Sequence, residues 1–418
     1  MTDPARRLAV RLSADAERQV RGGHPWVFDA SIRSVRATGG PDAPEPAAGD
    51  LAVVFDQRRR FVAIGLWDPT SAIRLRILHR GSPRRIDADW YREVVAAAAA
   101  RRAALVEGSS TTGYRVVNGE NDGLPGVVVD RYADTLVLKL YSSAWLVHLE
   151  DLLDALRAVW EPERIVLRLA RVVQRVVGDS APADGATLVG EPPVGPVIFL
   201  ENGLRVAADV VSGQKTGWFL DQRDNRERVR RLSRGAEVLD VFCAGGGFTL
   251  HAAAGGASSV HSVDLSAAAL EATRRNLLLN SDRAAVARCV HRSTEGDAVE
   301  VMGELRRRGA RVDLVVVDPP SFAAKQQQVE GALRAYRRLT GLAVDLLRPG
   351  GRLVQASCSA RVPTAEFLRA VQEGAAERGV DLGDVHVTGH PIDHPVGFPE
   401  GAYLKAVFAR IGDRGGAR

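Results

Sequence analysis

The chain has 418 residues, which at roughly 150 residues per domain predicts two or three domains. No apolar run reaches the roughly 18 residues that a membrane span needs, and Met1–Val20 lacks the apolar core of a secretory signal. We therefore expect a cytoplasmic protein with no membrane partner. Three cysteines do not make a disulfide framework and lack metal-ligand spacing, so we expect reduced thiols and no metal site.

The net charge of +5 is concentrated near the start of the chain. Residues 1–85 contain 15 arginines and 9 acidic residues, a balance of +6, so the remainder is close to neutral. A compact basic module ahead of a neutral body favours a nucleic-acid partner. The alternative explanation for this positive charge is heavy arginine use throughout the chain, which has only four lysines.

Residues 1–85 alternate short β-like runs with turns and predict a small β-barrel. The predicted strands are Leu8–Leu12, Leu51–Phe55, Phe61–Leu66 and Ile73–Leu78. The Gly/Pro/Ala-rich stretch Thr38–Gly49 reads as a loop, and Trp90–Glu107 as a helix.

A second module, 86–208, predicts an α+β domain. Its expected strands are Val127–Asp130 and Leu136–Tyr141 as a hairpin, then Ile165–Leu169, Val197–Leu200 and Leu204–Ala208. The stretch Ala144–Val159 has helical periodicity, and Gly178–Pro196 is a turn-rich connector.

From residue 209 to 418 strands and helices alternate, which predicts an α/β, doubly wound, Rossmann-like domain. The expected strands are Glu237–Phe242, Val260–Leu265, Ala285–Val290, Val312–Val317 and Arg352–Ala356, with Val385–Thr388 and Tyr403–Ala409 as a terminal hairpin. The expected helices are Ala267–Asn280, Ala298–Arg308, Gly331–Leu347 and Thr364–Arg378.

A glycine-rich turn follows the first of these strands and opens a helix, the geometry that receives an anionic ligand. A dinucleotide fingerprint would need a third glycine at position 250, which is leucine. Acidic residues at the ends of the next elements instead favour an S-adenosylmethionine (SAM) site, with Asp264 as ribose acceptor and Asp297 near the adenine. Asp264 as a solvated loop carboxylate and Asp297 as a helix N-cap are the alternatives. The candidate cofactor residues here are Asp240, Phe242, Gly245, Gly247, Phe248, Asp264 and Asp297.

Two further signatures end neighbouring apolar strands: Asp318-Pro319-Pro320 and Ser357-Cys358-Ser359. Ligands bind beyond the carboxyl ends of strands in open α/β sheets, so these groups are expected to meet. A Cys358 thiolate could add to C6 of cytosine while Asp318 holds the N3/N4 edge of the base. Pro319 and Pro320 would fix the backbone so that a carbonyl faces the exocyclic amine. Structural roles for Cys358 and Asp318 are the alternative, and Cys243 and Cys289 are expected in the core.

Several stretches resemble the 23S ribosomal RNA cytosine-5 methyltransferases that carry an N-terminal PUA domain. They run from residue 24 to 401 and are His24–Phe28, Gly119–Gly126, Lys215–Arg223, the Asp318 and Cys358 motifs, Asp393–Pro395 and Pro399–Gly401. The resemblance implies an RNA-binding PUA domain (1–85), a central α+β domain (86–208) and a class I methyltransferase domain (209–418) that uses SAM.

The resemblance also implies that Phe219, Gln222 and Arg223 lie near the cofactor and that 23S ribosomal RNA is the partner, with a homodimer left open. Many RNA cytosine-5 enzymes have a second cysteine directly after the Asp-Pro-Pro motif, where this chain has Ser321. The implied mechanism therefore uses one thiol. Arg223, Arg226 and Arg230 would share one helix face, as a phosphate track or as a solvated face.

Two rivals remain at this point. A guanine-methylating enzyme of the same fold would need no thiol, and a non-catalytic RNA-binding protein would need none of Asp240, Asp264, Asp318 and Cys358.

Overall fold

The computed structural model describes residues 7–37, 44–107, 110–178, 181–323 and 325–412. The chain forms two compact units. One comprises Met1–Phe199, Ala208–Trp218 and Ile392–Phe398, and the other Leu200–Ala207, Phe219–Pro391 and Pro399–Arg418. The predicted division into three domains stays a prediction.

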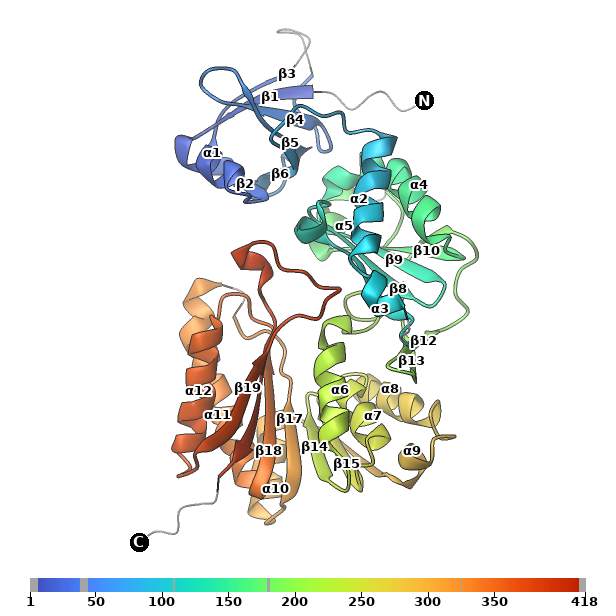
Figure 1. Cartoon of the computed structure of the whole chain (residues 1–418), viewed down its shortest axis with the longest axis vertical. Coiled ribbons are helices and arrows are strands. Elements are labelled where there is room, and N and C mark those ends of the chain that lie inside the picture. Colours follow the sequence, from blue (N-terminus) through green and yellow to red (C-terminus); the bar gives the residue numbers. More distant parts are fainter. Residues whose placement is uncertain (1–6, 38–43, 108–109, 179–180, 324, 413–418) are drawn as a thin grey trace. The chain divides into compact units, whose positions relative to one another are not determined.

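The first unit begins with a six-stranded sheet in the order β2-β6-β5-β4-β1-β3 (Figure 1). Only the β1–β4 pair is parallel. The strands are β1 (Arg7–Leu12), β2 (Trp26–Phe28), β3 (Ile32–Ala37), β4 (Leu51–Phe55), β5 (Phe61–Trp67) and β6 (Ile73–Arg80), with helix α1 (Ala14–Arg21) after β1. The four predicted strands are confirmed, whereas β2, β3 and α1 were missed because they are short or largely polar. Part of the predicted loop Thr38–Gly49 lies outside the described residues.

The rest of the first unit is a five-stranded sheet in the order β11-β10-β9-β8-β7 with helices packed against it. Its strands are β7 (Gly113–Asn118), β8 (Val127–Tyr132), β9 (Thr135–Leu140), β10 (Arg164–Leu169) and β11 (Thr187–Val189). Its helices are α2 (Ala88–Ala100), α3 (Ala103–Val106), α4 (Leu149–Trp160) and α5 (Arg171–Val177). The predicted β8–β9 hairpin is confirmed. One hydrophobic core joins Leu51 and Leu66 of the first sheet to Trp90 and Trp145, so the two sheets of this unit share a core.

The predicted single helix Trp90–Glu107 is wrong, because the helix breaks between α2 and α3 at Arg101–Arg102. There the fully buried Arg102 donates to the carbonyl oxygens of Ala98 and Arg115, at 3.0 Å each. The two-stranded β12 (Val197–Glu201) and β13 (Leu204–Ala208) follow as predicted.

The second unit is built on a seven-stranded sheet in the order β16-β15-β14-β17-β18-β20-β19. The strands are β14 (Glu237–Val241), β15 (Ser259–Asp264), β16 (Val290–Glu295), β17 (Val312–Val317), β18 (Leu347–Ser357), β19 (Leu382–Thr388) and β20 (Lys405–Ile411). The first five are mutually parallel, and β20 is antiparallel to both neighbours. This confirms the predicted doubly wound sheet and its terminal hairpin.

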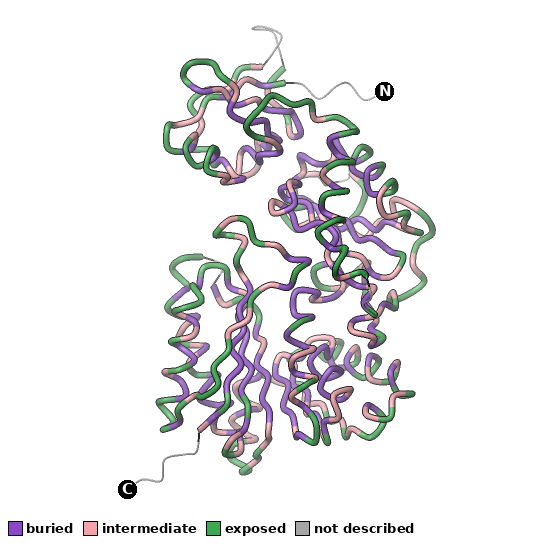
Figure 2. The backbone as a smooth tube through the Cα atoms, in the orientation of Figure 1, coloured by how far each residue is buried: buried purple, intermediate pink, exposed green. Residues whose placement is uncertain are grey.

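Helices cover both faces of this sheet (Figure 1). They are α6 (Arg223–Leu232), α7 (Gly247–Ala254), α8 (Ala267–Leu278), α9 (Ala284–Arg288), α10 (Ala298–Arg307), α11 (Val329–Leu346) and α12 (Thr364–Ala376). Alternate strand residues feed two cores: Leu239 and Val315 pack with α10, α11 and α12, whereas Val238 and Leu314 pack with α6 and α7. The central strands are accordingly buried along most of their length (Figure 2).

The predicted strand Ala285–Val290 is wrong. Most of this stretch is helix α9, and the strand β16 starts at Val290. The run Ala284–Arg288 is alanine-rich and favours a helix. The true strand, Val-His-Arg-Ser-Thr-Glu, is polar because it lies at the sheet edge, with β15 as its neighbour, and therefore lacks the apolar signature of a central strand.

Candidate functional site

The carboxyl ends of β14, β15, β17 and β18 meet at one edge of the second unit's sheet, because these strands are parallel and adjacent. The predicted site residues Asp240, Asp264, Asp318 and Cys358 all lie on or directly after these strand ends. The edge therefore combines the glycine loop after β14 with the two motifs expected to carry chemistry.

The loop between β14 and α7 has an unusual backbone. Two non-glycine residues, Phe242 (φ 63°) and Ala244 (φ 48°), have left-handed conformations, as has Gly246 (φ 78°). Such positions cost roughly 1–3 kcal/mol each for non-glycine residues and persist where surrounding structure enforces them. Strain of this kind clusters at ligand sites, in agreement with a cofactor loop.

Asp240 holds the start of α7 from within the sheet. It is fully buried, and its Oδ2 accepts hydrogen bonds from the Thr249 backbone N–H (2.9 Å) and hydroxyl (2.6 Å). Its Oδ1 is buried and has no partner among the described residues. Burial raises the pKa of Asp240 to about 6, although the Thr249 bonds oppose the shift. The orphaned Oδ1 is a point at which a bound polar ligand would find an acceptor.

Asp264 ends β15 and braces the same loop. Its two carboxylate oxygens accept from the backbone N–H groups of Ala244 and Ser266, both at 2.9 Å. Each carboxylate oxygen can accept more than one hydrogen bond, so Asp264 keeps the capacity to receive ribose hydroxyls. The carboxylate is therefore attached to the loop and is not simply solvated.

Glycines of this loop are required by close packing within the protein. A Cβ on Gly246 would lie 2.5 Å from the Thr273 side chain, and a Cβ on Gly247 would lie 2.6 Å from Arg226 Nε. Gly245 contributes its carbonyl oxygen, which accepts from the Asn276 amide at 2.8 Å. Close packing against α8 and α6 thus explains Gly246 and Gly247 before any ligand is considered.

The expected arginine face of α6 is neither a phosphate track nor a solvated face. Arg226 is 2% exposed, and its Nη1 contacts both oxygens of the fully buried Glu201 at 2.6 and 2.7 Å. Arg223 is also buried, and Arg230 is partly buried against the Asn202 carbonyl oxygen. His251 Nε2 lies 3.7 Å from Glu201, and burial lowers the pKa of His251 to about 4, so it is neutral at pH 7. These side chains stabilise the base of the loop.

The residues of the Phe219–Arg223 stretch lie at the start of α6. The Phe219 carbonyl oxygen accepts a hydrogen bond from Arg226, and Gln222 Oε1 accepts from the Asn225 amide at 2.6 Å. Arg223 Nε contacts Asp224 at 3.1 Å. Cofactor contact by Phe219, Gln222 and Arg223 stays a prediction.

Two other predicted cofactor residues have structural roles in this structure. Phe248 is 5% exposed and packs in the core with Val229 and Val238. Asp297 is exposed and is the N-cap of α10, where it accepts from the backbone N–H groups of Val299 (2.9 Å) and Glu300 (3.1 Å). The alternative role of Asp297 as a helix N-cap is confirmed. Contact between Asp297 and the adenine stays a prediction.

The Asp-Pro-Pro and Cys358 motifs are brought together. The Cys358 Sγ lies 4.0 Å from the carbonyl oxygen of Pro319, at the ends of adjacent strands β18 and β17. Pro319 is buried, whereas Asp318 and Cys358 are half-buried and so within reach of a ligand.

A hydroxyl network fixes the residues on both sides of Cys358. The Tyr336 hydroxyl, from α11, lies 2.8 Å from Ser357 Oγ and 3.1 Å from Ser359 Oγ, and Ser359 Oγ lies 3.1 Å from Ser321 Oγ. The serine that replaces the second cysteine of related enzymes thus contributes to this network.

Sequence reasoning missed two residues that contact the Cys358 segment, Tyr336 and Lys405. Lys405 begins β20, is 2% exposed, and donates from Nζ to the carbonyl oxygens of Ser359 and Tyr403. A lysine at an otherwise apolar strand start, in a chain with only four lysines, was the available signal.

The other two cysteines are poor nucleophiles. Cys243 is 4% exposed and Cys289 is half-buried, and burial is the main cause that raises the pKa of each thiol. Cys243 is in the core as predicted, and Cys289 packs at the margin of the core formed with α6 and α7.

The stretches Gly119–Gly126 and Asp393–Pro395 lie together in the first unit and form its framework. Asp122 accepts two hydrogen bonds from Arg102 (2.6 and 2.8 Å), and Arg102 also donates to the Asp393 carbonyl oxygen at 2.9 Å. The Asp393 carboxylate in turn accepts from the Arg115 backbone N–H at 2.9 Å. These motifs are therefore structural.

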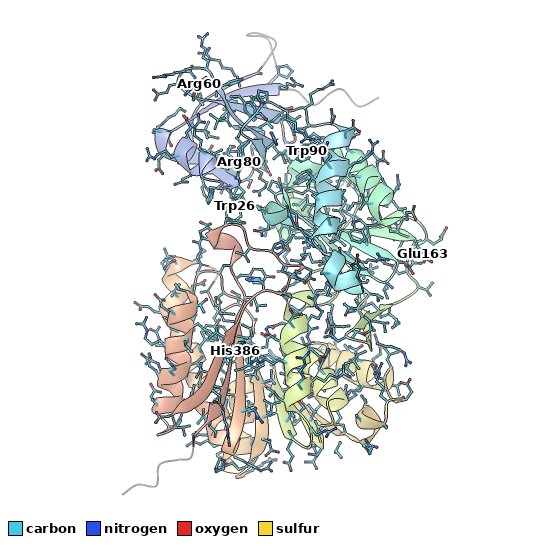
Figure 3. The ribbon with its side chains drawn as sticks, viewed as in Figure 1. Trp26, Arg60, Arg80, Trp90, Glu163 and His386 are labelled. Atoms are coloured by element: carbon cyan, nitrogen blue, oxygen red, sulfur yellow. The ribbon has the colours of Figure 1, made fainter. Side chains whose placement is uncertain are left out.

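A cluster of aromatic side chains, which includes Trp26 and Phe398, lies at the edge of the six-stranded sheet. The Trp26 ring contacts Phe398 edge to face (centroids 5.0 Å apart), and Trp26 Nε1 donates to Glu120 at 2.7 Å. Trp26 on β2 and Arg80 at the end of β6 are labelled in Figure 3. Aromatic and cationic groups together are typical of surfaces that contact nucleic acid.

Across the described ranges, no helix has the length and apolarity to cross a bilayer. In the same part of the chain, no group of three or more His, Cys, Asp or Glu side chains is arranged to hold a metal ion.

Comparison with known proteins agrees with this geometry. Residues 164–410 match the family model of S-adenosylmethionine-dependent methyltransferases, and residues 10–80 match that of PUA-like domains. A ribosomal RNA large subunit methyltransferase of Deinococcus radiodurans is 46% identical over 411 residues, covering 97% of this chain and 98% of the relative. The ribosomal RNA large subunit methyltransferase I of Shewanella amazonensis is 35% identical over 414 residues, covering 97% and 99%.

Two solved structures share the fold. A protein from Streptococcus mutans assigned as a SAM-dependent methyltransferase superposes with a TM-score of 0.78 at 19% identity, covering 96% of this chain and 99% of the other. A second structure, assigned as a methyltransferase and complexed with SAH, has a TM-score of 0.79 at 20% identity, covering 97% and 99%.

Proposed function

This chain belongs to the family of SAM-dependent ribosomal RNA large subunit methyltransferases, and we propose that it forms 5-methylcytosine in 23S ribosomal RNA through a transient bond between Cys358 and C6 of the base. The observation that carries the proposal is the approach of Cys358 Sγ to the Pro319 carbonyl oxygen, at 4.0 Å, beside the half-buried Asp318. Methylation of a heteroatom would need no such thiol.

The residues of the strand edge fit a bound SAM molecule. The orphaned Asp240 Oδ1 and the Asp264 carboxylate offer acceptors, and the Phe242–Gly246 loop presents backbone groups between them. When bound, SAM supplies an electrophilic methyl group. We assign Asp264 to the ribose hydroxyls, and Asp297 to the adenine edge in addition to its capping role.

The protein's own contribution is to activate the base. C5 of cytosine is a weak nucleophile, and addition of the Cys358 thiolate to C6 gives C5 enamine character. Asp318 holds the N3/N4 edge and stabilises the charge that develops there, while the Pro319 carbonyl oxygen accepts from the exocyclic amine. C5 would then take the methyl group from SAM, which would leave as S-adenosylhomocysteine. Loss of the C5 proton to a base would allow the sulfur–C6 bond to break and restore the thiolate. A base within a stem must first be unstacked, which costs a few kcal/mol.

The test combines product analysis with trapping. We expect the purified protein, incubated with SAM and 23S ribosomal RNA, to produce 5-methylcytosine detectable by nucleoside mass spectrometry. Cys358→Ala should lower the rate by at least about 1,000-fold, since it removes the nucleophile. RNA containing 5-fluorocytidine should form a covalent complex with the wild-type protein, because fluorine cannot leave as a proton.

Cys289→Ala is the matched control, because Cys289 is a half-buried thiol packed beside a core cluster, away from the Asp318 and Cys358 motifs in the chain. It should keep full activity. Full methyl transfer by Cys358→Ala would refute the covalent route and favour a guanine target. A protein that binds RNA but neither binds SAM nor methylates would be a non-catalytic RNA-binding protein.

A further inference from the structure

Lys405 lies beside the strand end that carries Cys358. Strands β18 and β20 are antiparallel, and their register pairs Ser357 with Lys405. Lys405 Nζ donates to the carbonyl oxygen of Ser359, the residue directly after Cys358, and to that of Tyr403 at 3.2 Å. The ammonium group is therefore attached to the same short segment that carries Cys358.

The burial of this ammonium group needs an explanation. Lys405 is 2% exposed, and a buried charge without compensation costs several kcal/mol. An ammonium has three N–H donors, of which two go to carbonyl oxygens. None of the ion pairs among the described residues joins Lys405 to a carboxylate, and the hydrogen-bond acceptors of its ammonium group are the neutral carbonyl oxygens of Ser359 and Tyr403. The anion that this position lacks can be supplied by the thiolate of Cys358.

We propose that Lys405 is a positioning residue that stabilises Cys358 as a thiolate and fixes the strand end that carries it. The proposal deepens the proposed function, because it assigns a source for the nucleophile's charge. A thiolate near a lysine is favoured over the thiol, and only the thiolate attacks. Cys358 then loses its proton to solvent before the base is bound.

The other titratable groups that face this segment come from each neighbouring element. Asp318 follows β17, and Tyr336 of α11 contacts Ser357 and Ser359. Burial raises the pKa of Tyr336, and the nearby charges of Cys358 and Asp318 add to the shift, so this phenol is neutral.

On the other side of Lys405, the Tyr403 hydroxyl donates to Asp221 at 2.9 Å and its ring contacts His390 at a centroid distance of 4.6 Å. Among these groups, Lys405 is the one whose ammonium group donates a hydrogen bond to the Cys358 segment.

Lys405 keeps its charge at neutral pH. Burial lowers the pKa of Lys405 to about 8, whereas the Cys358 charge acts in the opposite direction. At pH 7 roughly nine-tenths of Lys405 is then protonated, by the ordinary titration relation. Adduct formation needs a deprotonated Cys358 and a protonated Lys405, so its rate should fall on the basic side near pH 8.

The test measures the thiol directly and needs neither RNA nor SAM. Iodoacetamide alkylation of the full-length protein, followed by peptide mass spectrometry across pH 5–10, gives the apparent pKa of Cys358. We expect a value below the free thiol value of about 8.5 in the wild type. In Lys405→Met this pKa should rise by about one unit or more, which slows alkylation at pH 7 about tenfold. Lys405→Arg should restore the wild-type pKa of Cys358 in this alkylation assay. In the separate trapping experiment with SAM and RNA that contains 5-fluorocytidine, it should also remove the decline in adduct formation near pH 8.

The controls separate a local charge effect from unfolding. Lys139→Met removes a lysine that also donates to a backbone carbonyl oxygen, that of Lys215 at 2.8 Å, but lies in the other unit, and it should leave Cys358 unchanged. Buried Cys243 must stay unreactive in each variant, since its alkylation would report unfolding.

A wild-type Cys358 pKa at or above about 8.5 overturns the proposal even if Lys405→Met does not fold. An unchanged Cys358 pKa in folded Lys405→Met also overturns it. If the pKa responds as expected but no 5-methylcytosine forms, the proposed function fails and this inference stands.

Discussion

Gly247→Ala tests whether the glycine of the cofactor loop is needed for packing within the protein or only for binding the ligand. A Cβ at this position would lie 2.6 Å from Arg226 Nε and 2.8 Å from its Cδ. Arg226 cannot withdraw easily, because it is 2% exposed and bound to both oxygens of Glu201 and to the Phe219 carbonyl oxygen. The methyl group must therefore displace a buried ion pair.

The magnitude follows from opposing contributions. Overpacking costs about 1–3 kcal/mol, and the lower backbone entropy of alanine returns about 0.5–1 kcal/mol. Rupture of the buried Arg226–Glu201 pair would raise the cost to about 3–5 kcal/mol. We expect Gly247→Ala to lower the free energy of unfolding by about 2 kcal/mol in the absence of SAM.

Urea unfolding followed by circular dichroism, without SAM, is the assay. Gly303→Ala in α10 is the matched control, because its Cβ would meet only the mobile end of Arg307 at 3.6 Å. It should stabilise the protein by about 0.5–1 kcal/mol. If Gly247→Ala matches Gly303→Ala in stability and loses only SAM affinity, the glycine serves the ligand and this reasoning is wrong.

Two further predictions concern the acidic residues Asp240 in β14 and Asp297 at the start of α10. The pKa of Asp240 in the folded protein, about 6, lies above its unfolded value, so its contribution to stability is complete below about pH 4 and is lost as the pH rises through 6. Asp240→Asn keeps an acceptor for Thr249 and should remove this pH dependence of stability. In the wild type, the free energy of unfolding measured in urea should differ by an amount on the order of 3 kcal/mol between pH 4 and 7 because of Asp240. If the variant shows the same pH profile as the wild type, a buried Asp240 that becomes charged is contradicted. Asp297→Ala removes the acceptor for the backbone N–H groups of Val299 and Glu300 and should cost about 1 kcal/mol, whereas Asp297→Ser should restore most of it. Equal midpoints for Asp297→Ala and the wild type would show that the cap contributes nothing.

The sequence alone was sufficient to predict the parallel sheet and the meeting of the Asp318 and Cys358 motifs at its edge. Buried parallel strands such as Val312–Val317 are continuous apolar runs, and the carboxyl ends of parallel strands necessarily share an edge. Asp318 and Cys358 could therefore be paired from the sequence alone. The position of the edge strand β16 was predicted wrongly because this signal is absent there. A strand with only one neighbour in the sheet does not need an apolar run.

Only the tertiary structure decided which side chains meet across long sequence separations. Antiparallel insertion of β20 beside β18 places Lys405 at the Cys358 segment, and packing of α6 under α7 buries Arg226 against Gly247. An amphipathic pattern marks a helix face as polar but does not show whether another element covers it. Because Glu201 supplies the opposite charge from 25 residues upstream, a face that looks solvated in sequence becomes a buried ion pair.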